Sequence, residues 1–309
     1  ARYLWNELTD DDVSAELDWR VPFDLFDRGA AVKFGVAYRD RARDFGARRL
    51  NWLFLGNLYT DIDEALDTAR VVAKATAPGQ FSISDIVEPG DLYDAADTRM
   101  AGYLMLELPV TDALQAILGA RVENYRLDLT SRGEVLSEVD TTNVVPSLNL
   151  IYSIGENVTV RAAASRTVDR PEFRELAPFQ FTEATSLRQV FGNPDLTQAD
   201  IVSTDLRVDW FPGPGEMISL GGFYKQMDNP IEQVFVAAAS TAYSFQNAGD
   251  ATVLGVEADA QLALRRFSRA LQNFNAQVNY SWIESNVEVR QGSGGFEPTG
   301  ARRFGGPSS

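Results

Sequence analysis

Ten stretches of this 309-residue chain, each about ten residues long, alternate apolar with polar side chains. In the first, Val13, Ala15 and Leu17 share one face and Ser14 and Glu16 share the other, because the side chains of a strand point alternately to its two sides. The stretches are 12–21, 32–39, 100–108, 114–123, 146–152, 158–164, 202–210, 218–224, 254–262 and 273–282. An amphipathic helix has a period of 3.6, so the pattern predicts an all-β fold. Only 100–108 is apolar on both faces, which leaves its phase open.

The connectors between these stretches alternate between short and long. Short turns at 109–112, 153–156 and 211–216 contain the glycine or proline residues that turn dihedrals favour. The long connectors, at 42–99, 129–141, 167–199 and 226–250, exceed ordinary hairpin loops. This alternation predicts an antiparallel transmembrane β-barrel with tight periplasmic turns at one rim and long extracellular loops at the other.

Aromatic side chains occur near both ends of the predicted strands. Trp19, Tyr152 and Trp210 lie at turn ends, and Tyr38, Tyr224, Tyr280 and Trp282 lie toward loop ends. All of them share the apolar phase of their strand, so we expect two aromatic girdles at the lipid interfaces. The alternative is the general preference of aromatic residues for strands.

Composition narrows the possible functions. The chain contains neither cysteine nor histidine, which excludes thiolate chemistry, imidazole metal sites and histidine-based triads. No catalytic motif is present, and we expect no enzyme activity, no catalytic residue, no cofactor and no metal site. The formal net charge of −16 disfavours nucleic acid as a partner. The acidic runs 10–12 and 61–64 could supply oxygen ligands to calcium, but they lack the spacing of a calcium loop, so we expect solvated surface there.

Several motifs follow one another in a fixed order. They are PSLNL at 146–150, RAAASR at 161–166, RPEFRELAPF at 170–179, GNPDL at 192–196, GFYK at 222–225, DNPI at 228–231, NAG at 247–249 and GVE at 255–257. In this order they resemble the barrel of TonB-dependent outer-membrane receptors. The resemblance is clear over 98–282, whereas the first hundred residues fit by strand pattern more than by motif.

The resemblance implies that residues 1–309 form part of a barrel domain, about 10–12 strands of a 22-stranded barrel. It implies that the plug domain, the signal peptide and the closing strands lie outside this sequence. The expected location is the bacterial outer membrane, in contact with its lipid. The expected function is uptake of a scarce small molecule or glycan (a siderophore, cobalamin or an oligosaccharide), with energy from the inner-membrane TonB complex acting through the plug.

The polar phase of a wide barrel lines its lumen. The predicted lumen-lining residues are Glu16, Asp18, Arg20, Lys33, Arg39, Arg121, Glu123, Arg161, Asp205, Arg207, Asp209, Lys225, Glu257 and Asp259. Their mixed signs favour cross-strand pairs and plug contacts over an ion filter. The predicted ligand-binding residues of the external loops are Arg170, Glu172, Phe179, Phe181, Phe191, Tyr243 and Phe245. The alternative is structural: an ion pair that ties the loop to the rim for the two charged residues, and packing of one loop on another for the rings.

Two other classes of protein remain open. A passive porin or an adhesion barrel needs the same strands and loops but no plug. A soluble β-sandwich that binds carbohydrate would need a second sheet to cover the apolar phase. Within the first long connector, residues 63–74 have helix-like spacing and are expected to form a short surface helix.

Overall fold

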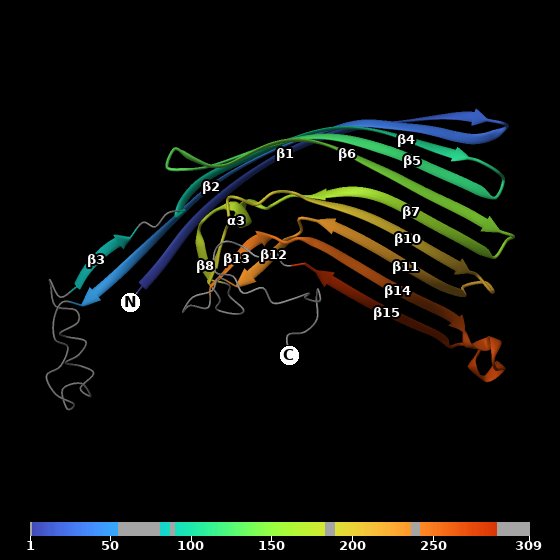
Figure 1. Cartoon of the computed structure of the whole chain (residues 1–309). Helices are drawn as coiled ribbons and strands as arrows, with labels where there is room; N and C mark the ends of the chain where they lie inside the picture. The colour runs from blue at the N-terminus through green and yellow to red at the C-terminus, as the bar shows by residue number, and fades with distance from the viewer. Residues whose placement is uncertain (1, 55–80, 87–89, 183–188, 236–241, 289–309) are drawn as a thin grey trace, which may run out of the picture.

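The computed structural model describes residues 2–54, 81–86, 90–182, 189–235 and 242–288. They form one broad, curved antiparallel sheet (Figure 1), whose strands follow in the order β1-β2-β4-β5-β6-β7-β10-β11-β14-β15, with β3 paired to β2. The ten predicted stretches lie on these ten strands in the predicted order, so the antiparallel all-β prediction is confirmed.

The main-sheet strands are β1 (Arg2–Leu25), β2 (Arg28–Phe54), β3 (Phe81–Ile86), β4 (Leu92–Pro109), β5 (Leu114–Ser131), β6 (Glu134–Ile154), β7 (Val158–Asp169), β10 (Ala199–Trp210), β11 (Met217–Asp228), β14 (Asp250–Ala263) and β15 (Asn275–Val287). The connections β7–β10 and β11–β14 supply the helix α3 (Phe173–Leu176) and the strands β8 (Gln180–Thr182), β9 (Gln189–Phe191), β12 (Ile231–Phe235) and β13 (Ala242–Asn247). These four strands form a second sheet in the order β12-β13-β9-β8, which lies on the concave side of the main sheet (Figure 1).

The connector predicted at 42–99 is shorter than expected, and that prediction is wrong at both of its ends. Strand β2 continues to Phe54 and β4 begins at Leu92, with an unbroken antiparallel register from Ala31 opposite Glu107 to Gly46 opposite Leu92. The alternation that identified the membrane stretches changes in 40–46 and 92–98. Polar residues there occupy the face that is apolar within the membrane, while the hydrogen-bond ladder between β2 and β4 continues. The expected helix at 63–74 lies outside the described residues.

The loop predicted at 129–141 is also wrong. Strands β5 and β6 pair almost to their tips, Ser131 opposite Glu134, and the turn consists of Arg132 and Gly133. Both turn residues have positive φ, 52° and 84°, which is the geometry of the tight turns that suit twisted hairpins. The β5–β6 connection is therefore a long protruding hairpin and not an irregular loop.

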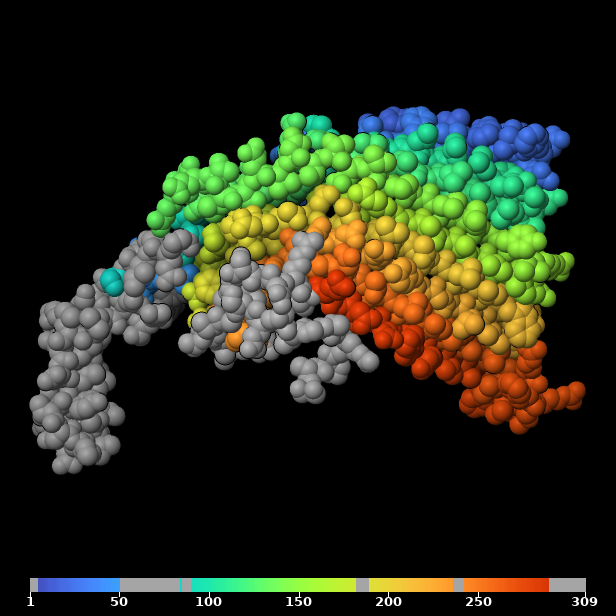
Figure 2. All heavy atoms as spheres, viewed as in Figure 1, coloured from blue at the N-terminus to red at the C-terminus, as the bar shows by residue number. Residues whose placement is uncertain are grey.

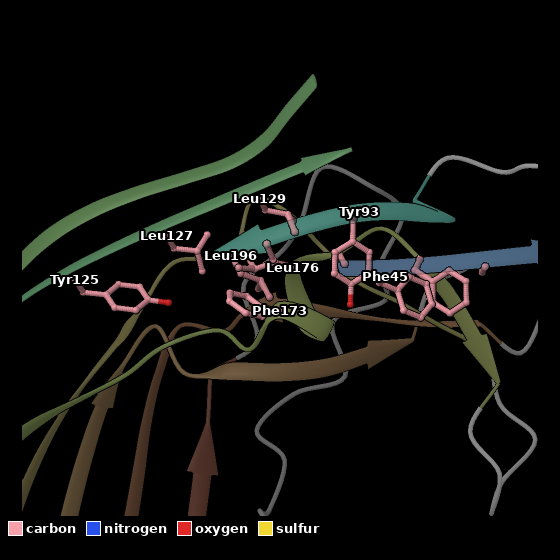
Figure 3. Packing of buried hydrophobic residues seen from close by; sticks show 12 residues of the cluster. Phe45, Tyr93, Tyr125, Leu127, Leu129, Phe173, Leu176 and Leu196 are labelled. Carbon is pink, nitrogen blue, oxygen red and sulfur yellow. The ribbon is translucent and has the colours of Figure 1, made fainter. Parts of the chain in front are cut away.

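In β2, β4 and β5 the apolar side chains lie on opposite faces at the two ends of the strand. Nearer the short turns, the residues in phase with Val36 (53% exposed) and Leu104 (52% exposed) form an apolar convex face. Near the loops, the residues of the other phase become apolar, and Phe45, Tyr93 and Leu127 pack on the concave side against Phe173 and Leu176 of the β7–β10 connection (Figure 3). The switch places lipid-compatible surface outside and a conventional core inside.

The register fixes the phase that the sequence left open. Leu104 lies opposite Phe34 on one side and Ala120 on the other, so Met100, Leu104 and Leu106 share the convex face. The seven expected girdle aromatics are all on this face and 40–62% exposed, and Trp19 stacks on Phe34 with ring centroids 5.5 Å apart. The second sheet lies near the loop ends on the concave side (Figure 1) and leaves this apolar face bare, so the soluble β-sandwich alternative is wrong. Within the described part of the chain, no helix is long and apolar enough to cross a membrane.

Candidate functional site

Five arginines lie close together on the concave face of the sheet. They are near the loop ends of the membrane stretches and are covered by the start of the β7–β10 connection. Arg39 and Arg41 come from β2, Arg99 from β4 and Arg121 from β5, and Arg170 follows β7. Register brings them together, because Arg39 lies opposite Arg99 on the neighbouring strand. They line two adjoining hollows of about 470 and 200 Å³ that share Arg39 and Arg99. We call this group the arginine pocket.

Most of these arginines are held by carboxylates. Arg39 Nε donates to both carboxylate oxygens of Asp12, at 3.1 and 3.0 Å. Glu123 accepts from Arg121 Nε at 2.6 Å and from Arg170 Nη2 at 3.0 Å, so it joins β5 to the root of the β7–β10 connection. Hydrogen bonds between charged partners are stronger than neutral ones, and these fix the positions of the side chains.

Arg41 lies between the wall and the loop. Its Nη2 donates to Glu172 at 3.3 Å, its Nε lies 3.6 Å from Asp97 Oδ2, and its guanidinium carbon is 4.1 Å from the centre of the Phe173 ring. The Nε atoms of Arg41 and Arg170 are buried and have no hydrogen-bond acceptor among the described residues. Buried donors without a partner are rare in proteins, and here two of them border the same hollow.

Arg99 differs from its neighbours because it makes no ion pair with any residue that the structure describes. It lines both hollows and is partly exposed. Arg121 and Arg170 share the carboxylate of Glu123, whereas no described carboxylate binds the guanidinium of Arg99. Arginine binds carboxylate groups through two parallel hydrogen bonds, so Arg99 is the side chain of this pocket best suited to contact an oxygen-rich ligand.

The electrostatic environment reflects burial under the loop. Burial raises the pKa of Asp97, and the nearby Arg41, Arg39 and Arg99 oppose that rise. Burial also raises the pKa of Tyr125, whose ring lies 4.7 Å from the guanidinium carbon of Arg170. The pocket therefore offers fixed cationic donors in a partly desolvated setting, where hydrogen bonds are stronger than in water.

The predicted lumen-lining residues all lie on the concave face. Arg39, Arg121 and Glu123 take part in the arginine pocket, and several of the others make side-chain contacts nearer the short turns. Glu107 binds both Lys33 (2.7 Å) and Arg20 (2.8 Å), and Tyr103 donates to Asp18 at 2.6 Å. Asp209 joins Arg207 and Arg161, and Asp259 accepts from Asn279 at 2.5 Å. No ion pair among the described residues involves Glu16, Asp205, Lys225 or Glu257. A role in lining a lumen stays a prediction for the whole set.

The predicted ligand-binding residues are distributed differently. Phe179 belongs to the buried cluster with 7% exposure, and Phe181 and Phe245 pack against that cluster. Phe191 is partly buried in β9, and Tyr243 contacts Phe235 with ring centroids 5.4 Å apart. Arg170 and Glu172 border the arginine pocket. Ligand contact stays a prediction for all seven, and the geometry of the aromatic residues is that of loop packing.

Sequence reasoning missed Arg41, Asp97 and Arg99 as site residues. The last two fell inside the connector predicted at 42–99, where no strand was expected. The alternation of Arg39, Arg41 and Arg43 with Asp40 and Ala42 could have extended the strand. No sequence signal could have revealed that Arg170, 47 residues after Glu123, shares its carboxylate.

Two other features of the chain bear on possible binding sites. An apolar hollow of about 600 Å³ lies on the convex face against Leu104, Leu118 and Leu148 and has only Arg166 as a charged lining residue. Among the described residues, no three acidic side chains come together in a group that could hold a metal ion. The acidic run 61–64 lies outside the described residues.

Comparisons with known proteins agree with this architecture. The family model described as "TonB dependent receptor-like, beta-barrel" matches residues 2–306. No curated protein sequence matches the chain significantly.

Solved structures share the fold at low sequence identity. The alcaligin outer-membrane receptor FauA from Bordetella pertussis has 15% identity and a TM-score of 0.55 over 97% of this chain and 42% of its own. The unliganded ferric citrate transporter FecA has 14% identity and a TM-score of 0.61, over 94% and 38%. The siderophore receptor PiuA from Acinetobacter baumannii has 13% identity and a TM-score of 0.60, over 95% and 41%.

The chain thus spans less than half the length of each of these solved structures. The curved sheet, the bare apolar convex face, the short turns at one rim and the folded loops at the other are the architecture of an outer-membrane barrel. With a family model that matches nearly the whole chain, this places the protein in the outer membrane of bacteria, and the chain belongs to the TonB-dependent receptors as part of their β-barrel.

Proposed function

We propose that this chain forms wall and external loops of a receptor that imports an iron–siderophore complex, with energy supplied by TonB. In this proposal the ligand rests in the arginine pocket and Arg99 contacts it directly. The observation that carries the proposal is a pair of adjoining concave hollows lined together by five arginines, one of which has no described ion-pair partner.

The donors of the pocket favour an oxygen-rich, charged ligand. Arg99 lines both hollows, and Arg41 and Arg170, which line the smaller one, each have a buried Nε without a described hydrogen-bond acceptor. Siderophores carry carboxylate, hydroxamate or catecholate oxygens that accept such hydrogen bonds. Sugars are commonly bound against exposed aromatic faces. Of the rings that line the two hollows, Tyr125 has 7% exposure, Phe173 has 1%, and Tyr38 belongs to the convex face. The pocket therefore supports a siderophore over an oligosaccharide.

The fold neighbours give independent support of a general kind. FauA is a receptor for alcaligin, FecA is a transporter of ferric citrate, and PiuA is a siderophore receptor. Other neighbours include a ferripyoverdine receptor and the copper transporter OprC. These ligands differ in chemistry, so the class of ligand for this chain rests on its own arginines.

Binding to the complete receptor tests the ligand class. Purified receptor and its Arg99→Gln variant would be titrated with a ferric hydroxamate, a ferric catecholate, ferric citrate, cobalamin and a maltodextrin. We expect one iron chelate to bind and the variant to lose about 10- to 100-fold in affinity, since hydrogen bonds to charged groups contribute about 1.5–3 kcal/mol. The control is Arg126→Gln, which removes an exposed arginine from the opposite face of β5 and should leave affinity unchanged. Equal affinity of Arg99→Gln and the parent would refute the assignment of Arg99.

Uptake measurements test the energy source separately. In cells that express the complete receptor, uptake of the bound chelate should stop when the TonB protein is removed. The passive porin alternative instead predicts that uptake persists without TonB and follows the concentration gradient. The adhesion alternative predicts no uptake in either strain.

A further inference from the structure

The connection between β14 and β15, residues 264–274, differs from the other turns at the same rim. It contains two short 3-10 turns, η1 (Leu264–Arg266) and η2 (Arg269–Leu271), neither of which has a buried residue. In Figure 1 it forms the orange projection at the end of β14, and it protrudes from the rim in the space-filling view of Figure 2. The β1–β2 turn, by comparison, consists only of Phe26 and Asp27.

The charge of this segment is opposite to that of the chain. Residues 264–274 contain three arginines and no acid, in a protein with a net charge of −16. Arg266 binds Glu216 at 3.1 Å, and Arg265 donates to the carbonyl of Pro214 at 3.5 Å. Neither Arg265 nor Arg269 makes an ion pair with any residue that the structure describes. Each of the other four turns at this rim carries an acidic residue: Asp27, Asp112, Glu156 and Glu216.

The same segment is apolar on its exposed surface and continues the lipid-facing wall. Leu264 donates its backbone N–H to the carbonyl of Phe274 at 2.9 Å, which extends the β14–β15 ladder by one step. Leu264 and Phe274 are in phase with Leu262 and Ala276, which lie on the convex face. Beyond them Phe267 is 67% exposed, Leu271 37% and Phe274 58%.

We propose that residues 264–274 form an interfacial anchor that binds anionic phospholipid headgroups of the inner leaflet. Phe267 and Leu271 enter the boundary between headgroups and acyl chains, and Arg265 and Arg269 contact the phosphates. Two observations select lipid as the occupant: the apolar surface is continuous with the wall that lipid already covers, and the two cations make no ion pair with any described residue. Aromatic rings with adjacent cations are the side chains that favour this boundary.

A spin label at position 267 tests the proposal in the complete receptor. This chain has no cysteine, so Phe267→Cys supplies a unique attachment point within it. The receptor would be placed in bilayers of phosphatidylethanolamine alone or with one part in four of phosphatidylglycerol. We expect the label to be more accessible to oxygen than to a water-soluble nickel chelate, and the preference to increase with phosphatidylglycerol and to decrease at high salt.

Charge removal supplies the matched comparison. With Arg265→Gln and Arg269→Gln in the labelled receptor, the phosphatidylglycerol-dependent gain should fall severalfold, because each cation near an anionic surface contributes about fivefold to partitioning. A label at Glu156→Cys, in the acidic β6–β7 turn, should stay accessible to water in both bilayers. If the label at 267 is accessible to water in both bilayers, the proposal is wrong. The segment then faces solvent or a periplasmic protein and not lipid. If the label at 267 is inserted to the same extent with and without phosphatidylglycerol, the proposed role of the arginines is wrong.

Discussion

At the scale of single residues, the concave wall is organised around carboxylates that each hold two cations. Asp209 has 1% exposure and binds Arg161 and Arg207, whose side chains are 49% and 41% exposed. Glu123 does the same for Arg121 and Arg170. A buried carboxylate between two arginines is costly to desolvate, and it is tolerated here because both oxygens are bound.

Asp209→Asn should therefore destabilise the barrel. The change leaves two arginines without their shared carboxylate, and we expect the free energy of unfolding to fall by about 1–3 kcal/mol, reduced from the value for fully buried pairs because both arginines are half-exposed. Urea unfolding of the complete receptor in detergent, followed by tryptophan fluorescence, measures this loss. Asp205→Asn is the control, on the same strand and face but exposed and without a described partner. Similar losses in both variants would contradict the shared-carboxylate role.

At the scale of elements, two long connections fold together on the concave side. Asn193 donates to the carbonyl of Phe245 at 2.9 Å, and the Asn247 side chain accepts from Thr197 N and donates to Thr197 O, both at 2.8 Å. The short helix α3 begins where the backbone N–H of Glu172 donates to the Glu175 side chain at 2.9 Å. Its Phe173 and Leu176 then anchor the assembly to the extended strands.

Phe173→Ala should release this anchor without unfolding the wall. Removal of a fully buried ring costs about 3–5 kcal/mol, and the cost falls on docking of the β7–β10 connection. Hydrogen exchange followed by mass spectrometry should show faster exchange in residues 173–182, with β10 and β11 unchanged. Phe235→Ala, at a ring with 46% exposure, is the control and should have a small effect. Unchanged exchange in 173–182 would show that the core contact does not hold the connection.

At the scale of the whole molecule, one curved sheet separates two environments. Val278 and Asn279 are neighbours on β15, yet Val278 lies on the convex face with 64% exposure, whereas Asn279 binds Asp259 on the concave face. This single layer has, among its described residues, no cluster of buried hydrophobic side chains within the membrane-spanning stretches. Its stability there rests on the hydrogen-bond ladder and on contact with lipid.

Arginine substitutions at these two adjacent positions should have opposite consequences. Val278→Arg places a cation in hydrocarbon and should cost about 2 kcal/mol or more, depending on depth. Asn279→Arg places the same side chain beside Asp259, where an ion pair forms, and should be close to neutral. Equilibrium unfolding of both variants of the complete receptor in lipid vesicles gives the comparison. A larger loss for Asn279→Arg would mean that the two faces are reversed.

The sequence by itself determined the strands within the membrane, their order and, except for 100–108, the faces of their side chains. Alternation of apolar and polar residues has a period of two, which is a local property that any ten residues reveal. The prediction of where strands end failed beyond Ala42 and Leu129. The surroundings change there from lipid to water, so the apolar side chains lie on the other face. The ladder itself continues through that change.

Only the tertiary structure decided how the loops fold and which arginines meet. The pairs Arg170–Glu123 and Arg41–Glu172 join residues 47 and 131 positions apart, and their contact depends on strand register and on how the connection packs. Such contacts arise from closure of the chain in three dimensions. A pattern with a period of two residues carries no information about them, so the arginine pocket became visible only once the strands were paired.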